Sequence, residues 1–334
     1  MIKVFTAFSG YDSQCLALRR LGLKFDLVGW SEIDRAAINA HNAVFPEYAE
    51  RNLGDIRGID WDTVQDFDLL TYSSPCTDFS TGGFMRGGEK GSGTRSLLLW
   101  EVERAIEIKR PKILLFENVP GIVTEKFIKT FHRWQGTLAS LGYTNFAKVL
   151  NSKDYNVPQS RQRVYMVSIL GNNARYYFPP SKPLQRRFFD MVERDVAQVY
   201  YVKRPDLLKH FAKFRAVANG GPVLLGWTRS HDNPTRDVRF HPVAVANTLT
   251  VRKRLTAQNY IVEAADRVRQ LTPRECLRLM DVDDTDIDKI IASGATKTQL
   301  YALAGNSIVV SVLAEIFRKI YIDTENEEKQ LTLF

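Results

Sequence analysis

Short apolar runs alternate with amphipathic stretches through the first 170 residues of the chain. Apolar runs predict five strands, at 2–8, 25–30, 68–72, 113–116 and 164–169. Between the strands, residues 97–108 and 125–141 repeat apolar positions at helical spacing. This alternation is typical of βαβ units, so we predict an α/β fold with a mostly parallel sheet in the first half of the chain.

The rest of the chain follows other patterns. Residues 175–248 hold few periodic runs and many turn-forming clusters, which predicts a second, smaller and irregular domain. Beyond it, Thr272 is expected to cap a helix that has Pro273 at its first position. A last helix, predicted over 308–321, carries an apolar stripe that we expect to pack on the sheet of the first domain.

Composition places the chain among globular proteins. Its 334 residues are 44% hydrophobic and 11% aromatic, which excludes a disordered chain. We find no run approaching the roughly 18 apolar residues of a membrane span, and no secretory cleavage site, so a cytoplasmic protein without membrane contact is expected. Cys15, Cys76 and Cys276 form neither a CxxC pair nor an even set, so neither disulfides nor a metal site are expected.

The positive charge is concentrated in one part of the chain. Residues 171–254 contain 16 Lys and Arg against six Asp and Glu, an excess larger than the net charge of +8 of the whole protein. Such a segment attracts a phosphate backbone, because each neutralised phosphate releases counterions. Charge alone fits a nucleic-acid surface and a solvated basic surface equally well.

The ends of the first two predicted strands suggest a cofactor site. Phe8-Ser9-Gly10 ends the first strand, and Glu32 follows the second, 22 residues after Gly10. An acid at about this distance binds the ribose hydroxyls of nucleotide-like cofactors at the edge of a parallel sheet. Glu32 by itself fits an ordinary surface acid as well.

The third strand end carries a cysteine. Cys76 follows Pro75, and residues 81–93 after it contain six glycines. A segment so rich in glycine is easily moved and suits a lid, which favours a nucleophilic role for Cys76. Cys15 and Cys276 fit the commoner interpretation of a small buried hydrophobe.

Three charged side chains near the next predicted strands are further candidates for a functional site. Glu117 follows the fourth strand, and Arg161 and Arg163 share one face of a predicted extended segment because they lie two residues apart. Each of them alone fits an exposed surface residue. Together, at successive strand ends, they predict an active site.

In this order along the chain, the motifs resemble those of the DNA cytosine-5 methyltransferases. The resemblance runs from Lys3 to about Tyr321 and leaves the middle segment unmatched. The similar motifs are Phe8-Ser9-Gly10, Glu32-Ile33, Gly54-Asp55-Ile56, Pro75-Cys76, Glu117-Asn118-Val119, Gln159-x-Arg161-x-Arg163, Leu271-Thr272-Pro273-Arg274-Glu275 and Gly305-Asn306-Ser307. The chain departs from the family at Asp12 and Ser13, where the FxGxGG cofactor loop commonly has glycines, and at Thr77, where Gln commonly follows the Pro-Cys pair.

The resemblance implies a Rossmann-like methyltransferase sheet and S-adenosylmethionine as the cofactor. The catalytic residues that it implies are Cys76, Glu117, Arg161 and Arg163. The cofactor-binding residues that it implies are Phe8, Gly10, Glu32, Ile33, Asp55, Ile56, Pro75, Asn306 and Ser307. In the implied reaction, Cys76 adds to carbon 6 of a flipped-out cytosine, and the methyl group moves to carbon 5.

The resemblance also divides the chain. Residues 1–174, completed by 299–322, are expected to form the catalytic and cofactor-binding domain, and 175–298 the target-recognition domain and hinge. Arg229, Arg236 and Arg239 are expected to contact guanine edges or phosphates of double-stranded DNA. A cognate restriction endonuclease that acts separately is a further partner that such enzymes imply.

Two other functions fit the same motifs. A tRNA cytosine-5 methyltransferase would use the same chemistry, and the strongly basic middle segment is our reason for preferring DNA. A catalytically silent DNA-binding protein would keep the fold. The intact set of Cys76, Glu117, Arg161 and Arg163 argues against it.

The last residues, 323–334, form an acidic and polar tail that we expect to be flexible. It ends in QLTLF, which resembles the pentapeptide with which bacterial proteins bind the DNA sliding clamp. Gln330 would supply hydrogen bonds, and an apolar pocket would accept Leu331, Leu333 and Phe334. Docking of this end on the protein's own sheet is the alternative.

Overall fold

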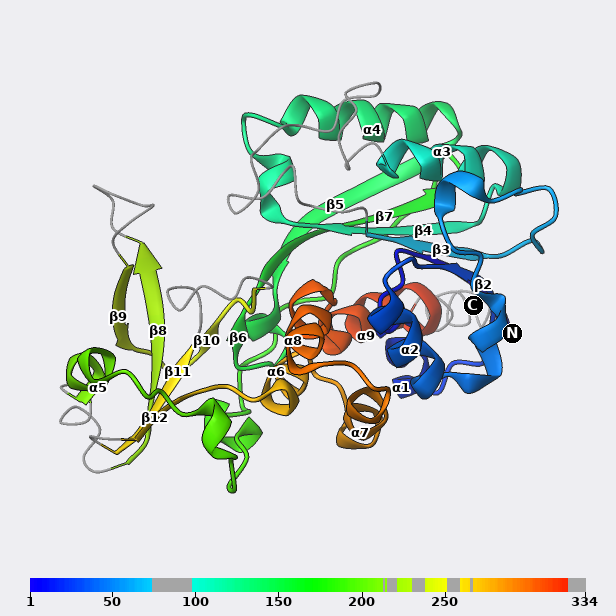
Figure 1. Ribbon diagram of the computed structural model, residues 1–334. Coiled ribbons are helices and arrows are strands. Elements are labelled where there is room, and N and C mark those ends of the chain that lie inside the picture. The colour runs from blue at the N-terminus through cyan, green and yellow to red at the C-terminus, as the bar shows by residue number, and fades with distance from the viewer. Residues whose placement is uncertain are drawn as a thin grey trace. The chain divides into compact units, whose positions relative to one another are not determined.

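The computed structural model describes residues 1–73, 98–212, 214, 221–229, 238–250, 259–264 and 267–323, which form two compact units (Figure 1). Unit 1 comprises Met1–Asn151, Gln162–Ser181 and the residues from Val310 onward, and unit 2 comprises Ser152–Arg161 and Lys182–Val309. Residues 152–161 and 299–309, expected in the catalytic domain, thus cluster with unit 2. The function of each domain stays a prediction.

A six-stranded sheet forms the centre of the described part of unit 1. In their order within the sheet, its strands are β2 (Phe25–Ser31), β1 (Ile2–Ala7), β3 (Leu69–Tyr72), β4 (Ile113–Asn118), β7 (Gln162–Leu170) and β5 (Tyr143–Asn151). The first four are parallel, whereas β7 runs antiparallel to both of its neighbours. The predicted α/β fold with a mostly parallel sheet is confirmed.

Helices cover both faces of this sheet. Figure 1 shows α3 (Leu98–Lys109) and α4 (Ile128–Ser140) on one face, and α1 (Ser13–Arg20), α2 (Arg35–Val44) and α9 (Val310–Arg318) on the other. The expected burial of the apolar stripe of α9 is confirmed, and on this face of the sheet α9 packs against α1. A π-helical turn, Lys319–Asp323, continues α9.

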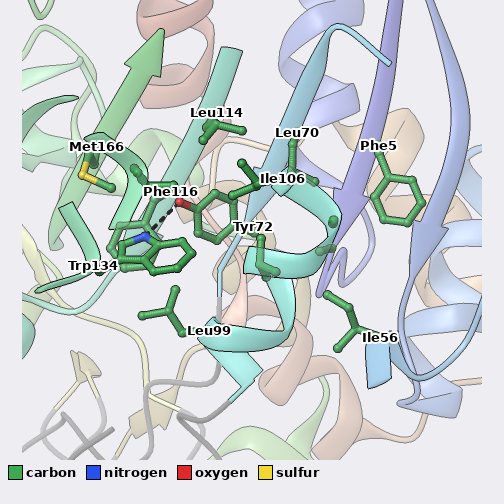
Figure 2. Close-up of a cluster of buried hydrophobic side chains, with 14 of the residues drawn as sticks. Phe5, Ile56, Leu70, Tyr72, Leu99, Ile106, Leu114, Phe116, Trp134 and Met166 are labelled. Atoms are coloured by element: carbon green, nitrogen blue, oxygen red, sulfur yellow. Dashed lines mark hydrogen bonds between the residues drawn. The ribbon is translucent and has the colours of Figure 1, made fainter. Parts of the chain in front are cut away.

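An aromatic cluster fills the core between the sheet and the α3–α4 layer (Figure 2). Trp134 of α4 donates a hydrogen bond of 3.1 Å to the hydroxyl oxygen of Tyr72, the last residue of β3. The ring of Tyr72 lies 5.4 Å from that of Phe116 in β4, its direct neighbour in the strand register. Burial raises the pKa of the Tyr72 hydroxyl far above its usual value, so it stays a neutral hydrogen-bonding group. The cluster fixes the end of β3, which precedes Cys76 in the sequence, and the end of β4, which contains Glu117.

Unit 2 contains a small antiparallel sheet, where the sequence predicted an irregular domain. Its strands, in sheet order, are β12 (Arg267–Gln270), β11 (Tyr260–Ala264), β8 (Val223–Arg229) and β9 (Val238–Pro242). A short parallel pair joins β6 (Gln159–Ser160) to β10 (Ala246–Asn247). The α-helices in the described part of unit 2 are α5 (Pro205–Ala212), α6 (Pro273–Leu279), α7 (Asp284–Ala292) and α8 (Lys297–Asn306). Helix α5 packs against β11 and β12.

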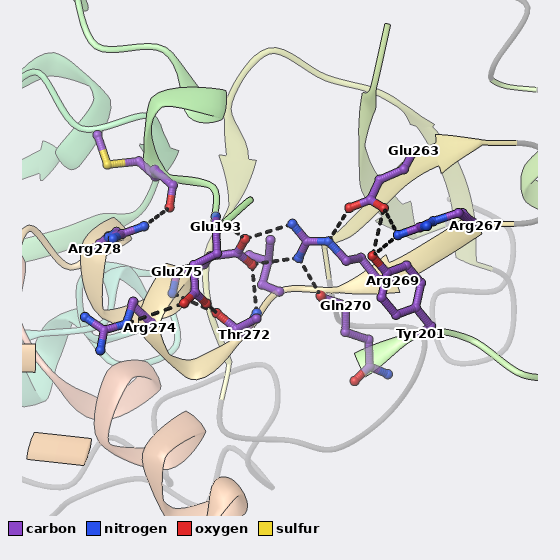
Figure 3. Close-up of polar contacts among 12 residues, drawn as sticks. Glu193, Tyr201, Glu263, Arg267, Arg269, Gln270, Thr272, Arg274, Glu275 and Arg278 are labelled. Carbon is purple, nitrogen blue, oxygen red and sulfur yellow. Dashed lines mark hydrogen bonds and ion pairs between the residues drawn. The ribbon is translucent and has the colours of Figure 1, made fainter. Parts of the chain in front are cut away.

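A buried ion-pair network joins this sheet to α6 (Figure 3). Arg269 of β12, fully buried, pairs with Glu263 at 2.6 Å and with Glu275 at 2.9 Å. Glu275 also closes the capping box of α6 with Thr272, whose backbone N–H donates to its carboxylate at 2.8 Å. The predicted cap of this helix, with Pro273 at the first position, is confirmed.

One stretch, Lys297–Asp323, is long and apolar enough to span a membrane by length and composition, contrary to our expectation from the sequence. Its most apolar 18-residue window has a mean hydropathy of 1.7, but 67% of that window is buried inside the protein. This is the environment of core helices in globular proteins, so core packing accounts for the apolar composition.

Candidate active site

The carboxyl ends of four parallel strands meet at one edge of the unit 1 sheet. In the strand register Ala7 lies beside both Ser31 and Tyr72, and Tyr72 lies beside Phe116. The residues that follow these four therefore share the edge at which open α/β sheets bind ligands.

A tight turn follows β1 at this edge. Phe8, Gly10 and Asp12 all have left-handed backbone conformations, with φ of 57°, 59° and 66°. The N–H of Ser9 donates to the carbonyl of Ser31 at 3.2 Å, which ties the turn to the end of β2. A Cβ atom built on Gly10 would meet nothing within 4 Å, so the space beside this glycine is open.

Glu32 organises the neighbouring strand end. One carboxylate oxygen accepts the N–H of Gly10 at 3.0 Å, and the other accepts those of Ile33 and Asp34 at 2.8 and 2.9 Å. The side chain of Ile33 is 69% exposed, although it is large and apolar. A half-buried carboxylate beside an exposed apolar side chain suits a ligand with a sugar and a planar base.

Asn52 supports this arrangement, and the sequence analysis missed it. Its amide oxygen accepts the N–H groups of Glu32 and Gly54 at 3.2 and 3.0 Å, and its amide nitrogen donates to the carbonyl of Glu32. A lone Asn in a turn carries no recognisable sequence signal, because its partners become neighbours only in the folded chain.

The two residues after Gly54 have different surroundings. Asp55 accepts hydrogen bonds from the guanidinium and the backbone N–H of Arg57, and these bonds lower the pKa of its carboxyl group. The side chain of Ile56 is 2% exposed and belongs to the core of unit 1 (Figure 2). The side chain of Ile56 therefore packs in the core, and its expected contact with the cofactor stays a prediction.

Glu117 and Arg163 meet at the same edge. The Nε atom of Arg163 lies 3.1 Å from Oε1 of Glu117, and the side chains are 13% and 9% exposed. A mostly buried, charge-assisted pair of this kind is strong and directional. Cys76 and Pro75, also expected here, lie outside the described residues.

Arg161 has a different environment from Arg163. It is 3% exposed, and its guanidinium donates to the carbonyls of Gly305 and Ser307, both at 2.8 Å, and of Leu249 at 3.2 Å. The expected common face is absent because the extended segment is interrupted at Arg161, between β6 and β7. Contact of Arg161 with a substrate base stays a prediction.

The remaining expected residues are spread over unit 2 and the tail. Asn306 is exposed at the end of α8, and Ser307 donates to the carbonyl of Ala304 at 3.0 Å. Arg229 and Arg239 lie on the paired strands β8 and β9, while Arg236, Gln330, Leu331, Leu333 and Phe334 lie outside the described residues. Within the described ranges no group of three His, Cys, Asp or Glu side chains is arranged to hold a metal ion.

The two other cysteines, Cys15 and Cys276, are buried, as expected, and both are free thiols. Burial, together with the nearby charges of Asp12 for Cys15 and of Glu275 for Cys276, raises the pKa of both thiols. Neither is therefore a candidate nucleophile.

Comparisons with known proteins show the family to which the chain is similar. The family model described as C-5 cytosine-specific DNA methylase matches residues 2–322. The chain is 32% identical to the type II methyltransferase M2.ScrFI of Lactococcus lactis subsp. cremoris, over 96% of this chain and 99% of that protein. It is 33% identical to the type II methyltransferase M.NgoBI of Neisseria gonorrhoeae, over 96% and 93% of the two chains. The fold is similar to that of the S. pombe Dnmt2 methyltransferase, with a TM-score of 0.70 at 18% identity over 98% of this chain and all of that one.

Proposed function

The chain belongs to the family of C-5 cytosine-specific DNA methylases, and from this premise we propose that it methylates carbon 5 of a cytosine flipped out of a specific duplex sequence, with S-adenosylmethionine as the methyl donor. The enzyme is a DNA cytosine-5 methyltransferase by its relatives. The observation that carries the finer proposal is the buried Glu117–Arg163 pair at the sheet edge that also holds the turn at Gly10.

The residues at this edge fit S-adenosylmethionine. Open space lies beside Gly10, the Glu32 carboxylate is held by backbone N–H groups, and Ile33 is exposed. We propose that Glu32 binds the ribose hydroxyls, that Ile33 and Asp55 lie on the adenine side, and that Phe8, Pro75, Asn306 and Ser307 complete the site. The cofactor supplies an electrophilic methyl group.

The protein's own residues make carbon 5 of cytosine reactive. Carbon 5 is a weak nucleophile, so the Cys76 thiolate first adds to carbon 6 and a proton is held at N3 of the ring. Glu117 lies at the right edge to hold that proton, and Arg163 fixes its carboxylate. After carbon 5 receives the methyl group, its proton is removed and the bond to the Cys76 sulfur breaks.

Carbon 6 cannot be reached in a stacked base, so the base must leave the duplex. We propose that the basic segment holds the DNA, with Arg229, Arg236 and Arg239 on and between β8 and β9 contacting bases or phosphates. A cytoplasmic location fits this substrate. The type II relatives make a separately acting restriction endonuclease a reasonable partner.

A trapping experiment tests the covalent mechanism. Duplex DNA with 5-fluorocytosine in the target is expected to stay covalently bound after methyl transfer, because fluorine replaces the proton that must leave. Cys76→Ser should form no adduct and transfer no methyl group, yet bind cofactor and DNA as wild type does. Methylation of duplex DNA without an adduct would contradict the mechanism, and labelling of tRNA alone would favour the tRNA alternative.

We also propose the bacterial sliding clamp as a partner of the C-terminal QLTLF. A tethered motif of this kind raises the effective concentration of the enzyme on newly replicated DNA without a new DNA contact.

A further inference from the structure

Asp12 occupies an unusual position in the cofactor turn. Its φ of 66° and ψ of 62° place it in the left-handed region, which Asp tolerates better than most residues but which glycine adopts freely. It stands where the FxGxGG loop of similar proteins commonly has a glycine. Asp12 therefore has a backbone conformation that glycine adopts freely, and it carries a carboxylate that glycine lacks.

This carboxylate is fully buried and bound on several sides. It accepts the hydroxyl of Thr6 in β1 at 2.8 Å and the backbone N–H of Cys15 in α1 at 3.0 Å. The Cys15 thiol is a further hydrogen-bond partner. A side chain buried in this way is held in place, because no water is available to replace the hydrogen bonds that it would lose on moving.

A histidine from a third element approaches the same carboxylate. The Nε2 atom of His41 in α2 lies 3.6 Å from Oδ2 of Asp12, and the His41 ring stacks on Trp30 of β2 at 3.7 Å between centroids. Asp12 thus joins β1, α1 and α2. Its own N–H donates to the carbonyl of Ser9 at 2.9 Å and closes the turn that presents Gly10.

We propose that Asp12 is a positioning residue for S-adenosylmethionine: its buried anchor on Thr6 and Cys15 holds the turn from Phe8 to Tyr11 in the shape that the cofactor needs. This inference rests on the proposed function, because it assumes that the cofactor binds at this turn. Asp12 itself points into the protein, so its effect on the cofactor passes through the backbone of the turn.

We expect substitutions of Asp12 to weaken the binding of S-adenosylmethionine and to leave DNA binding unchanged. Asp12→Ala should raise the Kd and the KM for S-adenosylmethionine at least tenfold, while kcat at saturating cofactor stays within threefold of wild type and DNA affinity is unchanged. Asp12→Gly restores the residue common in similar proteins and permits the left-handed backbone, but it removes the anchor. It should therefore also weaken cofactor binding, by at least threefold.

Two further variants separate an effect on cofactor binding from an effect on the stability of the fold. Thr6→Val keeps the shape of a fully buried side chain and removes one hydrogen bond to Asp12, so it should weaken cofactor binding at least threefold in a folded protein. Leu138→Ala opens the buried core of unit 1 in α4 and destabilises the fold, but its cofactor KM should match that of wild type.

Calorimetric titration with S-adenosylmethionine and steady-state kinetics on duplex DNA give the required values. Cofactor affinity within twofold of wild type in Thr6→Val and in any Asp12 variant that folds would overturn the inference, as would a fall in kcat with KM unchanged. If wild type itself fails to bind the cofactor, the proposed function fails and this inference falls with it. Binding by wild type with unchanged variants overturns the inference about Asp12 alone.

Discussion

Arg163 and Glu117 are diagonal neighbours across two antiparallel strands. Glu117 of β4 pairs with Tyr165 of β7, and Arg163 lies two residues before Tyr165, so both charged side chains emerge on the same face. Their closest polar atoms are 3.1 Å apart. Because β7 runs antiparallel to β4, it places the guanidinium of Arg163 beside the carboxylate of Glu117.

Glu117→Gln should lower kcat by about 10²–10⁴, because the amide keeps the shape of the side chain but cannot hold and return a proton. Cofactor binding should be unchanged. Methyl transfer from labelled S-adenosylmethionine to duplex DNA measures the loss. Glu107→Gln, at an exposed position of α3, is the matched control. Wild-type turnover in Glu117→Gln would exclude the proposed role.

Arg161→Ala should mainly destabilise the protein. The guanidinium satisfies carbonyl oxygens of Leu249, Gly305 and Ser307, and its loss leaves at least one of them buried without this donor, at a cost of about 2–3 kcal/mol in the free energy of unfolding. Arg161→Lys should lose most of the same stability, since one ammonium cannot reproduce the fork of the guanidinium.

Urea denaturation of the Arg161 variants measures this effect. Arg187→Ala removes an arginine whose side chain is 82% exposed and should leave the urea midpoint unchanged. If Arg161→Ala kept the wild-type midpoint but lost turnover, Arg161 would act on the substrate and not on these carbonyls.

Five of the six strands of the unit 1 sheet were predicted from the sequence: the four interior strands and the edge strand β2. β1, β3 and β4 have helices on both faces, so their sequences read as apolar runs that no other element explains. Edge strand β5 exposes Ala147, Lys148 and Val149 and gives no such run. The four strands of the unit 2 sheet were not predicted from the sequence either.

The positions of Glu32 and Glu117 were predictable because the course of the strands alone decides them. Glu32 follows β2 and Glu117 lies near the end of β4, so the sheet brings both to one edge. The arrangement of Arg161 could not be predicted, because the i, i+2 rule holds only within a continuous strand, and the chain breaks there between β6 and β7. Ile56 was equally ambiguous, since an apolar side chain in a motif suits a cofactor and a core alike.

Exchange of residues 175–248 for the corresponding segment of a DNA cytosine-5 methyltransferase with a different recognition sequence should change which cytosines are methylated. The segment carries most of the basic excess, so DNA affinity of the wild type should also fall at least about tenfold between roughly 50 and 200 mM salt. Bisulfite sequencing of DNA from an expressing host reads the pattern. The same methylated sequence before and after the exchange would place recognition elsewhere in the chain.

The QLTLF tail should bind a bacterial sliding clamp. Immobilised clamp is expected to recover the full-length protein and to lose it when Leu333 and Phe334 are both changed to Ala, because two apolar anchors are removed. Thr332→Ala is the matched control and should be recovered as wild type is. Equal recovery of all forms, or of none, would dispose of the clamp as a partner.

The Arg269 network makes stability depend on pH (Figure 3). Burial alone would raise the pKa of Glu263, but hydrogen bonds from Arg269 and from the Tyr201 hydroxyl outweigh it and hold that pKa below its usual value. Because the folded protein then binds fewer protons than the unfolded chain, the contribution of Glu263 is complete above about pH 5 and disappears as the pH falls through the folded pKa.

Glu263→Gln should therefore be less stable than wild type at neutral pH and equal to it in acid. The amide keeps a hydrogen-bonding oxygen but cannot offer Arg269 a negative charge, so the difference in urea midpoint is largest where Glu263 is ionised in wild type. Unfolding at a series of pH values from neutral to about 3 measures this difference. Glu107→Gln, exposed on α3, should show no such trend. A difference between Glu263→Gln and wild type that stays constant over the whole series would show that the charge of Glu263 does not stabilise the folded protein.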